Sequence, residues 1–105
     1  MIEIQVFYVT KYLVTILIEN RNEIDDPEGQ TIYRDLILKG GYTLVQSVRT
    51  GKCLKFTIES KSEKTAGKEV TKMCDELRIY NPIVSTCIID QIDIISQVGQ
   101  FKLLK

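Results

Sequence analysis

The amino-acid sequence predicts an α+β protein in which an antiparallel sheet carries two helices on one face. Short segments alternate between apolar and polar residues, as half-buried strands do, and two longer segments repeat apolar residues at helical spacing. From Tyr12 onward these segments follow the order strand, helix, strand, strand, helix, strand. A chain with this order, βαββαβ, is expected to fold as a two-layer sandwich with ferredoxin-like geometry.

The first strand of this series is predicted at residues 12–19, where apolar and β-branched residues occupy both faces, as in a central strand. Before it, apolar residues alternate with mostly polar ones from Ile2 to Tyr8. We therefore expect residues 1–11 to be an N-terminal strand extension that lengthens the first strand or covers an edge of the sheet.

The first helix is predicted to begin at Pro27, after a loop that ends in two aspartates. The carboxylate of Asp26 is a good N-cap because it accepts hydrogen bonds from unpaired N–H groups of the first turn. Proline at the first helical position loses no hydrogen bond, since that N–H has no partner there. Gly29 is unexpected, because a helical glycine costs up to about 1 kcal/mol relative to alanine. We therefore expect another group to approach the bare backbone at Gly29.

The same helix is expected to extend to about Lys39. Its apolar residues form one stripe at helical spacing, and they are Ile32, Tyr33, Leu36 and Ile37. Gly40 and Gly41 should end the helix as left-handed residues, a conformation that glycine adopts at no steric cost.

Residues 42–49 and 52–59 are predicted to be two strands joined by a tight turn that contains Gly51. The turn places Arg49 and Lys52 beside that glycine. Such a hairpin tip could hold an anion or an acidic patch of a partner, and a solvated turn is the alternative.

The second helix is predicted to follow Ser60 or Ser62, either of which can cap its first turn. Its apolar residues keep helical spacing, and they are Ala66, Val70, Met73, Cys74 and Leu77. The helix should end near Ile79, because Pro82 follows and cannot continue it. A last strand is expected at residues 84–92.

Composition and charge argue against several classes of function. The 105 residues are enough for one domain, and 14 basic and 14 acidic residues give a net charge of zero. A dedicated nucleic-acid-binding protein usually has a basic excess. There is no histidine, so the commonest general base and metal ligand is missing.

The three cysteines, Cys53, Cys74 and Cys87, are odd in number and have no CxxC spacing. They predict reduced thiols in a cytoplasmic protein rather than a disulfide framework or a zinc site. No secretory signal is visible, and the longest apolar run, residues 13–18, is too short to span a bilayer.

Few residues are candidates for chemistry. Asp25 and Asp26 are adjacent carboxylates that could bind a cation, but a helix cap beside a solvated loop is the favoured interpretation. Cys74 lies on the apolar stripe of the second helix, where core packing is favoured over a nucleophilic role. We expect no catalytic residue, cofactor site or metal site on this chain.

Three motifs stand in an order that resembles the PurS family, the small subunits of phosphoribosylformylglycinamidine synthase. They are DPEGQ at residues 26–30, VRTGK at residues 48–52, and MCDEL at residues 73–77 followed by NPIV at residues 81–84. The likeness covers about residues 12–91 at near-identical spacing. It divides the chain into an N-terminal extension (residues 1–11), a PurS-like domain (residues 12–92) and a C-terminal tail (residues 93–105).

The resemblance implies a non-catalytic subunit of a purine-biosynthesis complex that makes an amidine from formylglycinamide ribonucleotide. ATP, magnesium and glutamine would be used by two partners, a synthetase subunit (PurL) and a glutaminase subunit (PurQ). The chain would form a homodimer or a dimer of dimers and bridge these partners in the cytoplasm, without nucleic acid or membrane. The residues expected at its interfaces are Asp26, Pro27, Gly29, Arg49, Gly51, Lys52, Asn81 and Pro82.

Two other interpretations remain open from the residues. Small regulatory domains with this order of elements bind amino acids at dimer interfaces, and the region of Gly29 and the predicted hairpin would then line a ligand pocket. A standalone enzyme using Asp25 or Asp26 would show turnover without partners.

Overall fold

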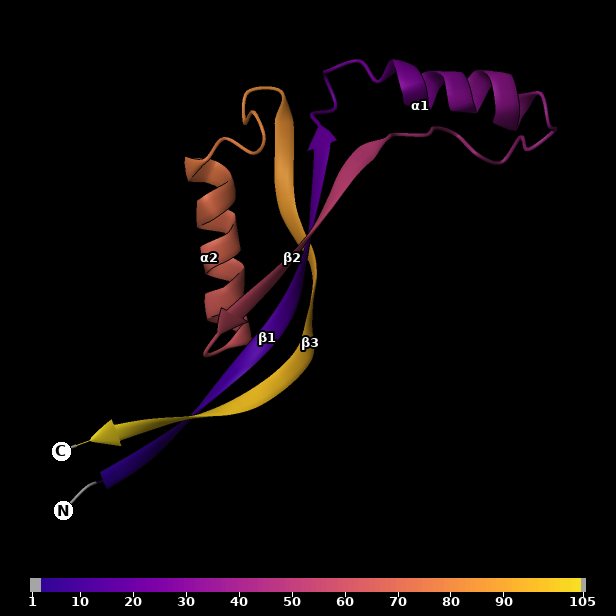
Figure 1. The fold of residues 1–105 in the computed structure, drawn as a ribbon. Helices are drawn as coiled ribbons and strands as arrows, with labels where there is room; N and C mark the ends of the chain where they lie inside the picture. Colours follow the sequence, from indigo (N-terminus) through magenta and orange to yellow (C-terminus); the bar gives the residue numbers. More distant parts are fainter. Residues whose placement is uncertain (1–2, 105) are drawn as a thin grey trace.

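The computed structural model describes residues 3–104 as a three-stranded antiparallel sheet with one helix packed on it and another extending away from it (Figure 1). Along the chain the elements are β1 (Glu3–Asn20), α1 (Pro27–Thr31), η1 (Ile32–Leu38), β2 (Gly51–Ser60), α2 (Glu63–Glu76) and β3 (Ser85–Leu104). In the sheet β1 lies between β2 and β3. The predicted α+β class and antiparallel sheet are confirmed, although one strand fewer is present than expected.

The core lies between α2 and one face of the sheet. Alternate residues of β1 face the helix, since side chains of a strand point to opposite faces in turn. Together with residues one turn apart on α2 they form the buried cluster Tyr12, Val14, Ile16, Ile18, Ala66, Val70 and Cys74. Gly67 lets α2 approach β3 closely, because a Cβ there would lie 3.1 Å from Cδ1 of both Ile89 and Ile92. The predicted central position of residues 12–19 is therefore confirmed.

The segment after β1 forms one continuous helix, α1 followed by the π-helical η1, which we call the helical arm. It begins at the Asp26 cap as predicted, and Gly41 closes its end with φ +88°, whereas Gly40 does not adopt a positive φ. The arm does not pack on the sheet or on α2 (Figure 1). The prediction that two helices cover one face of the sheet is therefore wrong within a single chain, because among residues 3–104 only α2 does so.

The molecule is elongated because the arm and the far ends of β1 and β3 extend in different directions. Its principal extents are 76, 29 and 15 Å, and its radius of gyration is 20.7 Å. A compact chain of this length would have a radius of gyration of about 13 Å. Apolar residues consequently stay uncovered, including Leu36 with 66% of its surface exposed.

Residues 42–50 form no strand, so the predicted hairpin is wrong. β2 pairs with β1 instead, from Gly51 opposite Glu19 to Ser60 opposite Thr10. Residues 42–50 connect the arm to the sheet and have no strand beside them, which leaves Leu44 95% exposed. A segment forms a strand only where a second backbone is available for pairing.

Residues 3–104 begin and end in strands. β1 is uninterrupted over its 18 residues, so residues 3–11 of the predicted extension lengthen the first strand. β3 continues beyond residue 92 to Leu104, which pairs with Glu3, and is longer than predicted. Register shifts between Lys11 and Tyr12 and between Thr15 and Ile16 mark irregular pairing along β3. No helix within residues 3–104 has the length and apolar character that a bilayer crossing needs.

Candidate functional site

The motifs DPEGQ and VRTGK and the NPIV part of the third motif meet at one end of the sheet, where β1 ends and β2 and β3 begin, whereas MCDEL lies at the end of α2. We call this region the junction, and it comprises residues 20–29, 48–52 and 81–85. It contains all eight predicted interface residues, Asp26, Pro27, Gly29, Arg49, Gly51, Lys52, Asn81 and Pro82. Hydrogen bonds between residues far apart in the sequence hold the three segments of the junction together.

Asp26 connects the first turn of α1 to the residue before β2. The residue is only 6% exposed. Oδ1 accepts hydrogen bonds from the Gly29 N–H (3.2 Å) and the Thr50 hydroxyl (2.7 Å), and Oδ2 accepts one from the Thr50 N–H. The Thr50 N–H and hydroxyl stabilise the charged carboxylate and so lower the pKa of Asp26. The predicted cap is confirmed, and the carboxylate oxygens bond within the chain.

Gly29 is buried, and neighbouring atoms of the same chain leave no room for a side chain there. A Cβ at this position would lie 2.5 Å from Oδ2 of Asp26 and 2.5 Å from the carbonyl oxygen of Val48. The expected close approach is therefore made by residues 26 and 48 of this polypeptide. Contact of Gly29 with a partner stays a prediction.

Arg49 crosslinks the loop after β1. Its guanidinium donates hydrogen bonds of 3.1 Å each to the carbonyl oxygens of Asn20, Arg21 and Ile24. It thus does not stand at a hairpin tip, and its donors are directed at the chain's own backbone. Lys52 is exposed in the second residue of β2.

The turn before β3 is held from the opposite side of the junction. Nε and Nη2 of Arg21 donate to the carbonyl oxygen of Pro82 at 3.0 and 2.8 Å. The side-chain Oδ1 of Asn81 accepts a hydrogen bond from the Ile83 N–H (3.0 Å), and the backbone carbonyl oxygen of Asn81 accepts one from the Ser85 N–H (2.8 Å). Asn81 and Pro82 therefore shape the entry to β3.

Sequence reasoning missed three residues that hold the junction together. The sequence places Thr50 in a turn and Asn20 and Arg21 in a polar loop, with no sign of these contacts. The Ser85 hydroxyl donates to Oδ1 of Asn20 at 3.3 Å, a link across 65 residues. No local sequence pattern indicates these hydrogen bonds, because each one joins two segments that lie far apart in the sequence.

The junction is suited to orient the arm rather than to make or break bonds. A small cavity of 330 Å³ lies beside it and is lined by both Lys52 and Glu28, together with Thr50 and Ser85. Within the part of the chain that the structure describes, no three His, Cys, Asp or Glu side chains gather as a metal site would require.

The thiol on the second helix belongs to the core. Cys74 is fully buried, and its burial raises its pKa, while burial and the neighbouring Cys74 raise the pKa of Cys87 to about 11. Both thiols are therefore protonated at neutral pH, and the predicted packing role of Cys74 is confirmed.

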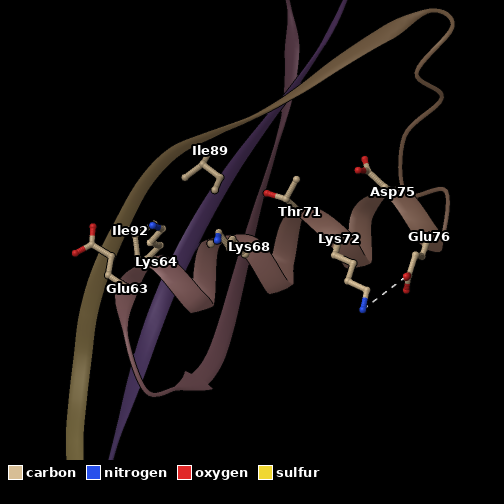
Figure 2. Close-up of a pocket in the computed structure, with 10 residues that line it drawn as sticks. Glu63, Lys64, Lys68, Thr71, Lys72, Asp75, Glu76, Ile89 and Ile92 are labelled. Atoms are coloured by element: carbon tan, nitrogen blue, oxygen red, sulfur yellow. Dashed lines mark ion pairs between the residues drawn. The ribbon is translucent and has the colours of Figure 1, made fainter.

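A second surface feature is an open groove along α2 and β3, which we call the α2–β3 groove. Its volume is 870 Å³. Figure 2 shows Ile89 and Ile92 of β3 beside one side of α2, along which Lys64, Lys68 and Lys72 also lie. Lys72 forms an ion pair with Glu76 at the rim (3.9 Å). The groove exists because α2 covers β1 and leaves part of β3 bare.

Known proteins resemble this chain over most of its length. Residues 13–93 match the sequence model of the family PurS, described as phosphoribosylformylglycinamidine (FGAM) synthase. The PurS subunit of this synthase from Archaeoglobus fulgidus is 32% identical over 72 residues, which are 69% of this chain and 88% of the relative.

Two solved structures share the fold. PurS of Methanocaldococcus jannaschii, described as one of the subunits of formylglycinamide ribonucleotide amidotransferase, has a TM-score of 0.67 and 29% identity, covering 81% of this chain and 99% of that chain. A chain in the structure of PurLQS from Thermotoga maritima has a TM-score of 0.62 and 26% identity, covering 83% and 98%. These similarities do not support the amino-acid-binding alternative, for which the hairpin wall of the expected pocket is also missing.

Proposed function

We infer that this chain, which belongs to the PurS family of phosphoribosylformylglycinamidine synthase subunits, works as the non-catalytic small subunit of that complex in purine biosynthesis. The observation that carries this inference is the family match over residues 13–93 of 105. The ligase activity belongs to the assembled complex, and this chain contributes surfaces to it.

The partners that we propose are a PurL-like synthetase and a PurQ-like glutaminase. The Thermotoga structure named PurLQS contains a chain that shares this fold. Bridging the two subunits would let ammonia released from glutamine reach the synthetase, which would hold ATP and magnesium. We place the assembly in the cytoplasm, and the three unpaired cysteines fit such a reducing compartment.

We further propose that two copies of the chain associate through the arm and the α2–β3 groove. Within one chain the arm's apolar stripe packs on neither the sheet nor α2, and Leu36 is 66% exposed. The groove offers Ile89 and Ile92 beside α2. An amphipathic helix with apolar residues three and four apart is the usual ligand of such a groove.

This association explains why the predicted sandwich is incomplete in one chain. The arm of one copy, lying beside α2 of the other, would place two helices on one face of each sheet. The junction fits this role, because Asp26, Arg49 and Gly29 set the direction in which the arm leaves the sheet. Exchange of an element between copies is a common route to a dimer.

Reconstitution with PurL-like and PurQ-like subunits tests the proposed function. Omitting this chain should lower the glutamine-dependent rate by at least about tenfold. The synthetase alone should retain part of its rate with free ammonia, because its own chemistry does not need the bridge. Unchanged glutamine-dependent synthesis without this chain would contradict the proposal.

A variant of the arm tests the association separately. Leu36→Glu should halve the mass of the assembled particle measured by light scattering, because the new carboxylate would be buried in an apolar contact between copies. Arg34→Glu is the matched control, since Arg34 is exposed and lies off the stripe. Far-UV circular dichroism should show that both variants fold, and an unchanged mass for Leu36→Glu would count against this contact.

A further inference from the structure

Two of the three cysteines meet in the folded chain, although they belong to different elements. Cys74 lies in the last turn of α2, and Cys87 is the third residue of β3. Cys74 is fully buried in the core, and Cys87 is half-buried and packs against the same cluster. Both are free thiols in the structure. We call them the thiol pair, and the function proposed above makes no use of them.

The packing of α2 on β3 places the two thiols opposite each other. Figure 1 shows that α2 and the first part of β3 run in opposite directions. Gly67 of α2 lies against Ile89, because a Cβ there would be 3.1 Å from Cδ1 of Ile89. Cys74 follows Gly67 by about two helical turns and so lies on the same face of α2. Cys87 precedes Ile89 by two residues and so lies on the same face of β3. The two thiols accordingly share a hydrogen bond.

The surroundings of the thiol pair suit a disulfide better than a charged thiolate. Cys87 lies opposite Ile18 of β1, which is buried in the core. Burial is the main reason why the pKa of both thiols is raised, and the nearby carboxylate of Asp75 adds to the effect. That carboxylate also accepts a hydrogen bond of 2.7 Å from the Tyr80 hydroxyl. This environment disfavours a thiolate, whereas a disulfide is uncharged.

We propose that Cys74 and Cys87 form a reversible disulfide that joins α2 to β3 when a low-molecular-weight disulfide such as oxidised glutathione is in excess. The thiolate of the half-buried Cys87 attacks one sulfur of the oxidant and releases the other as a thiol. The Cys74 thiolate then attacks the Cys87 sulfur and releases the second thiol. Two hydrogen atoms and two electrons thus pass from the protein to the oxidant, which leaves as two thiols.

The disulfide would hold the segment that connects α2 to the junction. The loop that it closes, residues 74–87, contains the end of α2, Arg78 with its positive φ, and the turn at Asn81 and Pro82. Closing such a loop removes conformational freedom from the unfolded chain and so stabilises the folded state. The effect belongs to the single chain and does not depend on the synthase complex.

The thiol pair should exchange slowly with other thiols. The attacking species is the thiolate, and little of it is present at neutral pH because the pKa of Cys87 is about 11. A thiol of high pKa is also a poor leaving group, so the finished disulfide resists reduction by other thiols. The pair therefore responds to sustained oxidation and is unsuited to rapid catalytic exchange.

Oxidation of the full chain with excess oxidised glutathione tests the proposal. Trypsin cleaves after Lys72 and Arg78, so it places the two cysteines on different peptides. After remaining thiols are blocked, mass spectrometry without reduction should find residues 73–78 linked to the peptide that begins at Ile79. Dithiothreitol should separate these peptides. Glutathione attached to Cys87 without a link to Cys74, or two unmodified thiols at these positions, would overturn the proposal.

Thermal unfolding measures whether the disulfide stabilises the fold. The oxidised wild type should melt about 10 °C above the reduced wild type at the same chain concentration. Cys87→Ser is the matched control, because it leaves Cys74 without a partner and keeps the exposed Cys53. The oxidant should leave the melting temperature of Cys87→Ser unchanged. An oxidised wild type that melts no higher than the reduced protein would show that the link does not stabilise the fold, and would overturn that part of the proposal.

The rate of oxidation tests the route. Because the attacking thiolate has a raised pKa, the rate at which the linked peptides appear should rise about tenfold for each pH unit between about pH 7 and 9. Acid quenching followed by mass spectrometry measures this rate. A rate that does not change with pH would overturn attack by the Cys87 thiolate.

Discussion

Asp26 has a local role and a long-range role at the same time. Its hydrogen bond to the Gly29 N–H follows from the residues around it, because an aspartate before a proline is a familiar helix cap. Its two bonds to Thr50 join residues 24 apart, and no pattern in the sequence signals them. The second role explains Gly29 as well, since the same convergence brings Val48 against the helix start.

Arg78 shows strain at a helix end that glycine would relieve. It has φ +53°, and the bonds from the Ile79 N–H to Cys74 O (3.1 Å) and from the Arg78 N–H to Asp75 O (3.4 Å) close α2 in the manner of a Schellman motif. Arg78→Gly should raise the free energy of unfolding by about 1 kcal/mol, because a left-handed non-glycine residue costs about that much. Urea denaturation measures the change.

A glycine substitution inside the same helix is the control for Arg78. Lys68→Gly removes an exposed lysine and should lower the free energy of unfolding by about 1 kcal/mol. If Arg78→Gly destabilised the protein as much as Lys68→Gly does, the strain at residue 78 would be disproved.

At the scale of elements, helices were predictable and one strand was not. α2 begins after the Ser62 cap and buries Ala66, Val70 and Cys74, as its spacing predicts. Leu77, which the prediction placed on the same apolar stripe, is 68% exposed, because the helix ends at Glu76 rather than near Ile79. The predicted strand at residues 42–49 contains apolar residues as β2 does, but it has no pairing partner within residues 3–104. A helix satisfies its hydrogen bonds internally, whereas a strand depends on a neighbour that local sequence does not specify.

The cap of α2 makes a testable contribution to stability. The Ser62 side chain accepts a hydrogen bond from the Thr65 N–H at 3.1 Å. Ser62→Ala should lower the free energy of unfolding by about 1 kcal/mol, measured by denaturant titration. Lys61→Ala, one residue earlier and exposed, should change it by less than about 0.5 kcal/mol. Equal effects of the two variants would contradict a specific cap.

At the scale of the molecule, the shape is that of one part of a larger assembly. The radius of gyration of 20.7 Å is large because the arm and the far ends of β1 and β3 extend away from the core. These segments have no compact core of their own. Stability should therefore depend on association between copies, because binding of one folded chain by another favours the folded state.

This dependence predicts a melting temperature that changes with protein concentration. A hundredfold increase in chain concentration should raise the melting temperature by about 5 °C, from the mass-action term shared between two chains. Leu36→Glu should reduce this rise, and differential scanning calorimetry measures both. A melting temperature independent of concentration would indicate that the single chain is stable by itself.

Features that depend on near neighbours are predictable from the sequence: the caps at Asp26 and Ser62, the periodicity of α2, the central strand, and the order of motifs that indicates the family. The sequence also indicated Asp26, Arg49 and Pro82 of the junction, but neither their hydrogen bonds nor the parts of Asn20, Arg21 and Thr50. Three other features follow from the folded chain alone: residues 42–50 are not a strand, Arg21 binds the Pro82 carbonyl, and the arm leaves its own sheet. These features depend on contacts between distant segments, and in the case of the arm on a surface that we place on a second copy.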